Sequence, residues 1–369
     1  MIPSICNGAK VGLEPKGELD VMRLPKRGLT RRSLALVLIG GVVVGGCSSP
    51  GEEPPEPNVQ VVDGQVARQL KSSVSDAGAV VHLQALQKIA DQNGGTRVSP
   101  GPGYDASVDY VAGVLRAAGY DVSTPTFEVS REHRGELGAG RNVITQTRTG
   151  DPAHVVVIGA HLDSVEDGPG IVDNGSGVAT LLEIARNLGP SAPLRNMVRF
   201  AFFGSEENEL EGSTSYVHSL SAADRDKIML YLNVDMVASP NAGYFAQGGV
   251  GDDQSETGPP GSAAVAGVLA GQLAATGVKP EIIKFVGDDE TPFVEADIPS
   301  GGAENGDAAD KPGAQAQAWG GQPGERYDPC YHKSCDRIEN VNRVVLGRYL
   351  SAIAGTVAHF TTSDKPLLR

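Results

Sequence analysis

The stretch HVVVIGAHLD, residues 154–163, decides the fold of this chain. It contains an unbroken apolar run, which is typical of a strand buried on both faces of a parallel or mixed sheet. Two more strands of this kind are expected at residues 197–203 and 229–234, separated by helical patterns at residues 178–188 and 211–220. The order strand, helix, strand, helix, strand predicts an α/β fold with a central mixed, mostly parallel β-sheet covered by helices on both faces.

The rest of the chain fits one folded domain, predicted at residues 76–369. Further helical and strand-like patterns are expected at residues 76–93, 108–119, 120–130, 141–147, 261–275 and 341–359. Residues 297–324, rich in Gly, Ala and Pro, predict a long loop. The sequence shows no internal repeat and no gap long enough for a second folded domain.

The N-terminus has the features of an export signal. Basic residues from Arg23 to Arg32 precede an apolar run at residues 34–44, which is too short for a membrane-spanning helix. Small residues lead from this run to Cys47, and this ending resembles a bacterial lipobox, whose cysteine is lipidated. An ordinary cleaved signal peptide with an incidental cysteine is the alternative.

We favour the lipoprotein, because the Pro/Glu-rich stretch after Cys47 is typical of a flexible tether. Residues 1–46 are then an N-terminal extension and lipoprotein signal peptide, and residues 47–75 are the tether. The protein is expected to be exported and lipid-anchored through Cys47 to the outer face of the cell membrane, or also released. Either Met1 or Met22 can be the true start.

Charge and cysteine content narrow the partners and the compartment. The formal net charge of −14 argues against nucleic acid, because phosphate binding needs clustered Lys and Arg. Of the four cysteines, Cys6 and Cys47 belong to the leader and the anchor, which leaves Cys330 and Cys335 in the stretch PCYHKSC. A disulfide between them is the default in an oxidising compartment. Such a stretch can still be a plain surface turn or hold two unrelated thiols.

Polar residues follow each of the three buried strands. They are His161, Asp163, Asp173, Glu206, Glu207 and Asp235. Because ligands bind outside the carboxyl ends of the strands in open α/β sheets, these residues should converge on one rim. The rim is either a water-filled acidic crevice with partly protonated groups or a site for divalent cations. Histidine together with carboxylates suits zinc, and His332 can supply a second histidine.

Taken singly, each of these residues is a weak signal. An Asp after a strand is often a cap, and Glu206-Glu207 fits the first turn of a helix. All of them together, in the order His, Asp, Glu-Glu, Asp, His, are much more specific. The sequence has no HExxH, GxSxG or GxxxxGK[ST] motif. The remaining histidines and Trp319 are expected to be surface or packing residues.

Five segments carry a resemblance to a known family. They are GAHLDS (159–164), GPGIVDNGSGVATLLEIAR (168–186), FFGSEENELEGSTSY (202–216), NVDMV (233–237) and DPCYHKSCD (328–336). The chain resembles the secreted co-catalytic di-zinc aminopeptidases, the aminopeptidase Y and bacterial leucyl aminopeptidase type of zinc exopeptidases. The subgroup implied is the small one without a protease-associated insert.

The resemblance implies two Zn²⁺ ions per chain and a role for each residue. His161 and Asp235 would hold one ion, Glu207 and His332 the other, and Asp173 would bridge them. Asp163 would orient the His161 imidazole, and the Asp173-Asn174 peptide bond would be cis. Glu206 would be the general acid/base that activates a metal-bridging water, and Tyr331 would hydrogen-bond the oxyanion.

The implied reaction is hydrolysis of the N-terminal peptide bond of peptides that have a free amine, with an apolar first residue such as leucine. A monomer is expected, and a calcium site is left open. Many relatives carry Ser-Asp-His-x-Pro-Phe where this chain has Asp288-Asp289-Glu290-Thr291-Pro292-Phe293, which puts substrate preference in doubt. The alternatives are another zinc hydrolase, a mono-zinc glutaminyl cyclase on the same scaffold, and a non-catalytic surface lipoprotein.

Overall fold

The computed structural model describes residues 64–131, 136–363 and 367. Within them eight strands form one central sheet, and a two-stranded hairpin, β2 (Thr126–Arg131) and β3 (Glu136–Arg141), is separate. In spatial order the strands of the sheet are β1 (Val122–Ser123), β4 (Val143–Gln146), β6 (Asn196–Phe203), β5 (Asp151–His161), β7 (Ile228–Val234), β10 (Ser300–Glu304), β8 (Phe245–Gln247) and β9 (Glu281–Ile283). Four neighbouring pairs are parallel and three are antiparallel.

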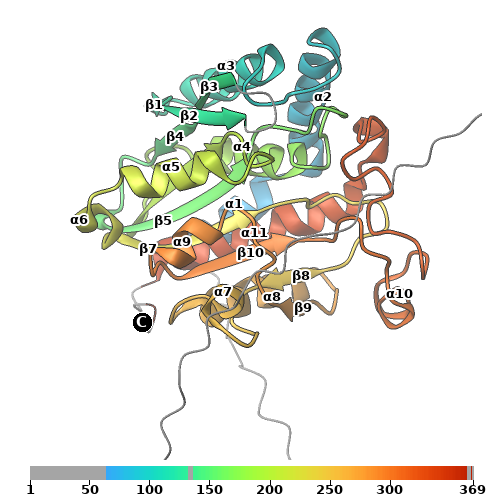
Figure 1. Ribbon diagram of the computed structural model, residues 1–369. Helices are drawn as coiled ribbons and strands as arrows, with labels where there is room; N and C mark the ends of the chain where they lie inside the picture. Colours follow the sequence, from blue (N-terminus) through green and yellow to red (C-terminus); the bar gives the residue numbers. More distant parts are fainter. Residues whose placement is uncertain (1–63, 132–135, 364–366, 368–369) are drawn as a thin grey trace, which may run out of the picture. The chain divides into compact units, whose positions relative to one another are not determined.

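Helices cover both faces of this sheet (Figure 1). They are α1 (Gln65–Ser73), α2 (Asp76–Gln92), α3 (Pro102–Ala117), α4 (Gly175–Leu188), α5 (Glu211–Ser219), α6 (Ala222–Arg225), α7 (Gln254–Thr257), α8 (Ser262–Ala274), α9 (Thr291–Glu295), α10 (Gly313–Trp319) and α11 (Arg343–Thr362), with a 3-10 turn η1 (Ile338–Asn340). Helices α4, α8 and α11 pack on one face, and α5 and α9 pack on the other. The predicted α/β fold with a mixed, mostly parallel sheet is confirmed.

Strand β5 is held from both sides, because its side chains alternate between the two faces. Val156 and Ile158 belong to the core under α4 and α11, whereas Val155 and Val157 belong to the core under α5 and α9. All four are at most 2% exposed. Since burying such a side chain contributes about 1.5–3 kcal/mol, the end of β5 at His161 is firmly fixed.

The start of α4 is tied to the end of β7 by one side chain. Asn174 caps α4, because its Oδ1 accepts a hydrogen bond from Gly177 N at 2.9 Å. Its Nδ2 donates to the carbonyl of Val234, the last residue of β7, at 2.8 Å. The Asp173-Asn174 peptide bond is cis, as predicted. The two hydrogen bonds of Asn174 keep Asp173 close to Asp235, the residue that follows β7.

The carboxyl ends of β5, β6 and β7 lie at one edge of the sheet. His161 pairs in register with Phe203, and Gly159 pairs with Asn233. The polar residues that follow β6 and β7 therefore emerge beside His161, as the sequence predicts.

The predicted tether is wrong in its last part. Residues 65–73 form α1, in which Ala67 and Leu70 are 2% and 3% exposed and belong to the main core. The Pro/Glu-rich composition ends before Gln65, and two apolar side chains three residues apart are enough to dock this short helix against α11. Cys47 and the predicted signal peptide lie outside the described residues.

The predicted loop at residues 297–324 is also wrong. It contains the central strand β10 and the helix α10. Gly301 and Gly302 lower the strand signal of β10, yet they fit there because neighbours fill the space of a side chain. A Cβ on Gly301 would lie 2.6 Å from Val265 Cγ1, and one on Gly302 would lie 2.7 Å from Gln247 Oε1.

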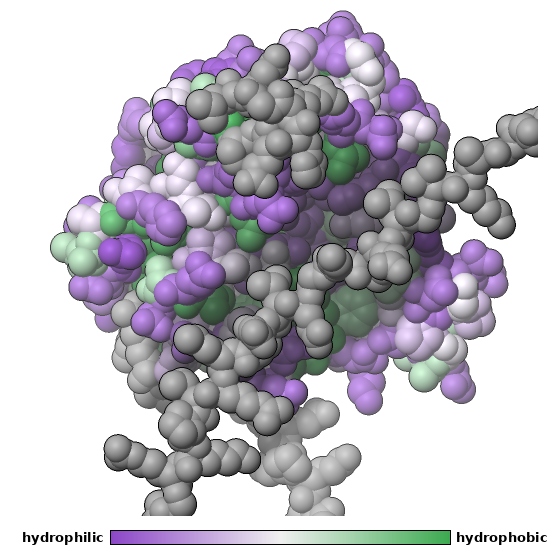
Figure 2. Space-filling view, viewed as in Figure 1, coloured by the Kyte–Doolittle hydropathy of each residue, from purple (hydrophilic) through white to green (hydrophobic). Residues whose placement is uncertain are grey.

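Hydrophilic residues predominate on the face seen in Figure 2. Among the described residues, no helix is both long and apolar enough to span a membrane. The large hydrophobic side chains exposed in this part of the chain are Val81, Val250, Ile282, Val286 and Val344.

Candidate metal centre

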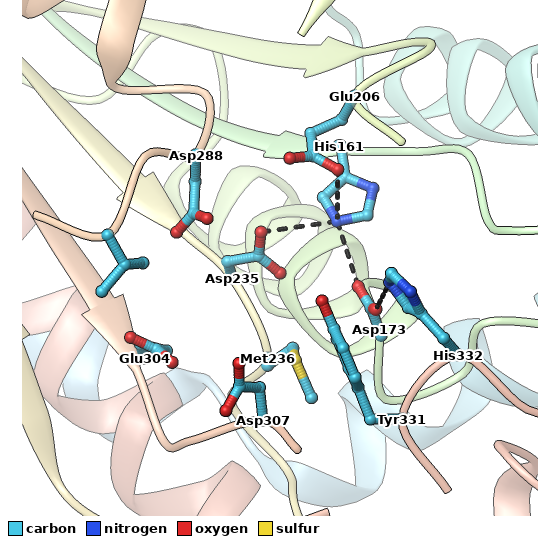
Figure 3. A pocket seen from close by; sticks show the side chains of 11 residues that line it. His161, Asp173, Glu206, Asp235, Met236, Asp288, Glu304, Asp307, Tyr331 and His332 are labelled. Atoms are coloured by element: carbon cyan, nitrogen blue, oxygen red, sulfur yellow. Dashed lines mark ion pairs between the residues drawn. The ribbon is translucent and has the colours of Figure 1, made fainter. Parts of the chain in front are cut away.

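Asp173 lies between the two predicted histidine ligands (Figure 3). His161 Nε2 is 3.2 Å from Asp173 Oδ1, and His332 Nε2 is 3.1 Å from Asp173 Oδ2. Each oxygen of one carboxylate therefore faces its own imidazole. This is the arrangement expected of a carboxylate that bridges two metal ions.

Asp235 and Glu207 complete two groups around Asp173. Asp235 Oδ2 is 3.4 Å from His161 Nε2, and Glu207 Oε2 is 3.0 Å from His332 Nε2. The five residues thus divide into the pairs that the resemblance implied, with Asp173 shared. Ligand atoms of His161, Asp173 and Glu207 also lie within 4.8 Å of one another, so the two groups form one compact cluster.

The residues of this cluster fit metal ions. Within the described ranges, the ion pairs of Asp173, Asp235 and Glu207 are with histidines and include no Lys or Arg. Asp235 Oδ1 and Glu207 Oε1 are buried and accept no hydrogen bond from the described residues. Unpaired buried carboxylate oxygens are costly, and cations that accept N and O ligands would remove that cost.

Protonation of the two histidines competes with metal binding. Burial lowers the pKa of His332, but its hydrogen bonds with Asp173 and Glu207 outweigh this and raise the pKa to about 10. Burial likewise opposes the charge on His161, yet the Asp235 and Glu206 carboxylates raise its pKa well above the ordinary value. A metal ion must displace both protons, so metal binding should weaken in acid.

Glu206 lies beside the ligands but belongs to neither pair. Its Oε2 is 3.9 Å from His161 Nε2, and its backbone N–H donates to Asp163 Oδ1 at 3.1 Å. Burial raises the pKa of Glu206 well above its ordinary value, although the His161 cation opposes this. A carboxyl group with a raised pKa next to a metal cluster suits general acid/base chemistry.

Asp163 and Tyr331 approach the two histidines from other directions. Asp163 Oδ1 is 3.6 Å from His161 Nδ1, slightly beyond hydrogen-bond distance. The Tyr331 ring stacks on His332 with centroids 3.8 Å apart, and its hydroxyl points toward the ligand carboxylates (Figure 3). Burial raises the pKa of Tyr331, so the phenol remains a hydrogen-bond donor.

Tyr331 and His332 belong to the loop closed by the predicted disulfide. The disulfide Cys330–Cys335 is present, with Cα atoms 5.3 Å apart. Cys330 N donates to Asp328 Oδ1 at 2.7 Å, and Asn340 Nδ2 donates to both Asp328 oxygens at 2.9 and 3.0 Å. The loop is therefore anchored on both sides of the two functional side chains.

A cavity of about 60 Å³ opens beside the ligands. Apart from the predicted site residues, its walls are Met236, Val286, Asp288, Glu304 and Asp307. The sequence does not predict Glu304 and Asp307 as site residues, because both fall in the stretch expected to be a loop. Glu304 ends β10, which runs parallel to β7, so the strand-end rule places it on this rim once β10 is recognised.

Glu290, which stands where many relatives are expected to have histidine, supports the cavity wall from the protein interior. It is fully buried, and its Oε1 accepts from Gly287 N at 3.3 Å and from Asp288 N at 3.2 Å. It therefore holds the turn that presents Asp288 to the cavity.

Two buried charged residues that sequence analysis did not single out hold the ligand loops. Arg97 is 0% exposed and donates to the carbonyls of Leu162, Pro169 and Gly170. Asp336 is 2% exposed and accepts from the backbone of residues 172 and 173. Neither residue follows a predicted strand, so the strand-end rule does not predict a role for them, and the DPCYHKSCD segment contains Asp336 without assigning it one.

A family model described as Peptidase family M28 matches residues 142–357, more than half of the chain. The chain belongs to Peptidase family M28. The predicted relationship to zinc exopeptidases is therefore confirmed at the level of the family.

Two curated proteins are similar to this M28 chain in sequence. Leupeptin-inactivating enzyme 1 of Streptomyces exfoliatus is 42% identical over 283 residues, covering 75% of this chain and 60% of the relative. The probable lipoprotein aminopeptidase LpqL of Mycobacterium tuberculosis is 32% identical, covering 78% of this chain and 86% of the relative. The LpqL alignment is 432 positions long and covers 78% of the 369 residues of this chain, about 288, so about 144 positions (432 minus 288) have no counterpart here.

Solved structures share the M28 fold. BSAP, a zinc aminopeptidase from Bacillus subtilis, superposes with a TM-score of 0.63 at 16% identity, covering 80% of this chain and 98% of that one. A glutaminyl cyclase from Porphyromonas gingivalis superposes with a TM-score of 0.59 at 22% identity, covering 78% and 98%. At these identities the likeness concerns the fold and does not separate the two activities.

Proposed function

We propose that the protein is a metal-dependent aminopeptidase that binds two Zn²⁺ ions and hydrolyses the N-terminal peptide bond of peptides. One observation carries this proposal. The two oxygens of the buried Asp173 carboxylate each face a different histidine, and each histidine faces a further carboxylate. His161 and Asp235 would hold one ion, Glu207 and His332 the other, and Asp173 both.

Bound zinc ions supply a water of lowered pKa and polarise the scissile carbonyl. Glu206, outside both ligand pairs, takes the proton of the attacking water and delivers it to the leaving amine. The Tyr331 hydroxyl points into the same space and donates a hydrogen bond to the carbonyl oxygen as negative charge develops on it. Asp163 fixes the segment by accepting the Glu206 backbone N–H, which places the base beside His161.

A second candidate concerns the first residue of the substrate. The name of one relative, Leucine aminopeptidase 2 of Trichophyton rubrum, supports an apolar first residue, and Met236 and Val286 would offer it apolar contacts. Asp288, Glu304 and Asp307 line the same cavity, and a lysine or arginine side chain would gain attraction there that leucine would not. This arrangement favours basic first residues as an additional substrate class.

The proposal is tested with zinc content and a panel of aminoacyl p-nitroanilides that includes leucyl, lysyl and N-acetyl-leucyl substrates. We expect two zinc ions per chain, turnover of the free-amine substrates and none of the acetylated one. Glu206→Gln should retain zinc and lose at least 100-fold in kcat. One zinc per chain without amide hydrolysis would instead favour a cyclase, and full activity of Glu206→Gln would refute the mechanism.

We also propose that the protein is exported and anchored through Cys47, as a lipoprotein. Support comes from the lipobox-like sequence and from the name of the relative LpqL. Cys47→Ala should move the protein from the membrane fraction to the soluble fraction. Unchanged membrane association would contradict lipidation.

A further inference from the structure

Asp336 connects the two loops that carry Asp173 and His332, two of the five predicted metal ligands. Its Oδ1 accepts from Val172 N at 2.8 Å, and its Oδ2 accepts from Asp173 N at 3.0 Å. Its backbone carbonyl accepts from Ile171 N at 3.2 Å. One residue thus receives three consecutive N–H groups, the last of which belongs to Asp173, the shared ligand.

The other side of Asp336 is fixed to the loop that carries His332. Asp336 N donates to the carbonyl of Lys333 at 3.0 Å, and Lys333 N donates to that of Cys330 at 3.0 Å. His332 Nε2 lies 3.1 Å from Asp173 Oδ2. Asp336 therefore holds both backbones, the one at Asp173 through its carboxylate and the one beside His332 through its main-chain N–H, and it fixes the separation between these two predicted ligands.

The two N–H donors require a carboxylate. Aspartate presents two acceptor oxygens, whereas asparagine presents one oxygen and one N–H₂ donor. An asparagine of the same shape would place its donor against Val172 N or Asp173 N. Because Asp336 is 2% exposed, water would not readily replace the lost acceptor.

We propose that Asp336 is a positioning residue that sets the metal affinity of the cluster, above all on the His332 side. The inference rests on the proposed function, since it takes the cluster to be a two-zinc centre. Outer residues that orient metal ligands typically change metal affinity by about 10–100-fold when they are mutated.

Calorimetric titration with zinc of the chelator-treated full chain tests this proposal. In Asp336→Asn we expect the weaker of two zinc-binding steps to lose about 10–100-fold in affinity, with a smaller change in the tighter step. Glu183→Gln is the matched control. Glu183 is 4% exposed, and its Oε1 accepts from Ser75 N at 3.1 Å, but it touches neither ligand loop. The control should lose stability without losing zinc affinity.

The proposal would be overturned if Asp336→Asn left the zinc affinity unchanged. It would also be overturned if, at equal loss of melting temperature, the affinity fell no more in Asp336→Asn than in Glu183→Gln. A wild-type chain that takes up fewer than two zinc ions would also overturn it. If Asp336→Asn does not fold, amide hydrogen exchange of the wild type tests the proposal instead. Rapid exchange of the Val172 and Asp173 amides would show that Asp336 does not hold this backbone. A chain that binds two ions but cleaves no aminoacyl substrate refutes the proposed function and leaves this inference standing.

Discussion

Arg97→Lys should destabilise the protein by about 1–3 kcal/mol, although it keeps the positive charge. The guanidinium donates to the carbonyls of Pro169 at 2.8 Å and Gly170 at 2.6 Å, and also to that of Leu162. These carbonyls lie on the segment between His161 and Asp173. A lysine ammonium is a compact donor on a different stem and cannot reproduce the planar fork.

The magnitude follows from the number of acceptors left without a donor. The Gly170 carbonyl also accepts from Gly175 N at 3.0 Å and keeps that donor. If lysine serves one of the other two carbonyls, one remains buried and unsatisfied, at about 1–3 kcal/mol. This is a sizeable part of the about 5–15 kcal/mol that stabilises a typical protein. Because the segment carries His161 and Asp173, zinc content at limiting zinc should fall as well.

Urea unfolding of the metal-free protein measures this effect. Arg148→Lys is the control, because Arg148 is exposed and also donates to a carbonyl, that of Gly119, at 2.6 Å. The control should change the free energy of unfolding by at most about 0.5 kcal/mol. If Arg97→Lys costs no more than Arg148→Lys, the reasoning about the buried carbonyls is wrong.

Three further predictions concern pH, the disulfide and specificity. Burial, with a contribution from Arg186, lowers the pKa of His82 to about 4, whereas its value in the unfolded chain is near 6.5. The neutral His82 therefore contributes its full stability above pH 6.5, and this contribution is lost as the pH falls toward 4. Between pH 7 and 5 the wild type should lose about 2 kcal/mol more in urea unfolding than His82→Gln, and equal losses would contradict this. Cys330→Ser/Cys335→Ser should cost at most about 2 kcal/mol of stability, because the loop is short. Zinc titration should show at least a tenfold weaker second site. Unchanged zinc binding would count against a positioning role for the disulfide. Glu304→Gln should lower kcat/KM for lysyl relative to leucyl p-nitroanilide about 5- to 10-fold, and an unchanged ratio would argue against basic substrates.

The parts of the fold that could be predicted are those with a clear apolar pattern, either an unbroken run, as in β5, or helical spacing, as in α2. β5, β6 and β7 each read as buried strands from their own side chains, so their ends located the ligands. β10 could not be read in this way, because Ser300-Gly301-Gly302 has few side chains and its strand character comes from β7 and β8 beside it. The missed strand also hid Glu304.

The candidate site divides along a similar line. His161, Asp173 and Asp235 follow strong local patterns, and the structure brings them together with Glu207 and His332. Arg97 and Asp336 act on backbone groups about 70 and 160 residues away in sequence, and nothing in their own neighbourhoods predicts such partners. Residues that bind backbone groups, and not metal ions, could therefore be identified only from the three-dimensional structure.

The order of the proposed metal ligands along the chain has a consequence for synthesis. Four of the five lie between His161 and Asp235, whereas His332 follows 97 residues after Asp235 (332 minus 235). At about 5–20 residues per second, roughly 5–20 s separate the translation of Asp235 from that of His332. During that interval the nascent chain holds only one of the two proposed histidine ligands. The proposed two-metal centre therefore stays incomplete until His332 has been made.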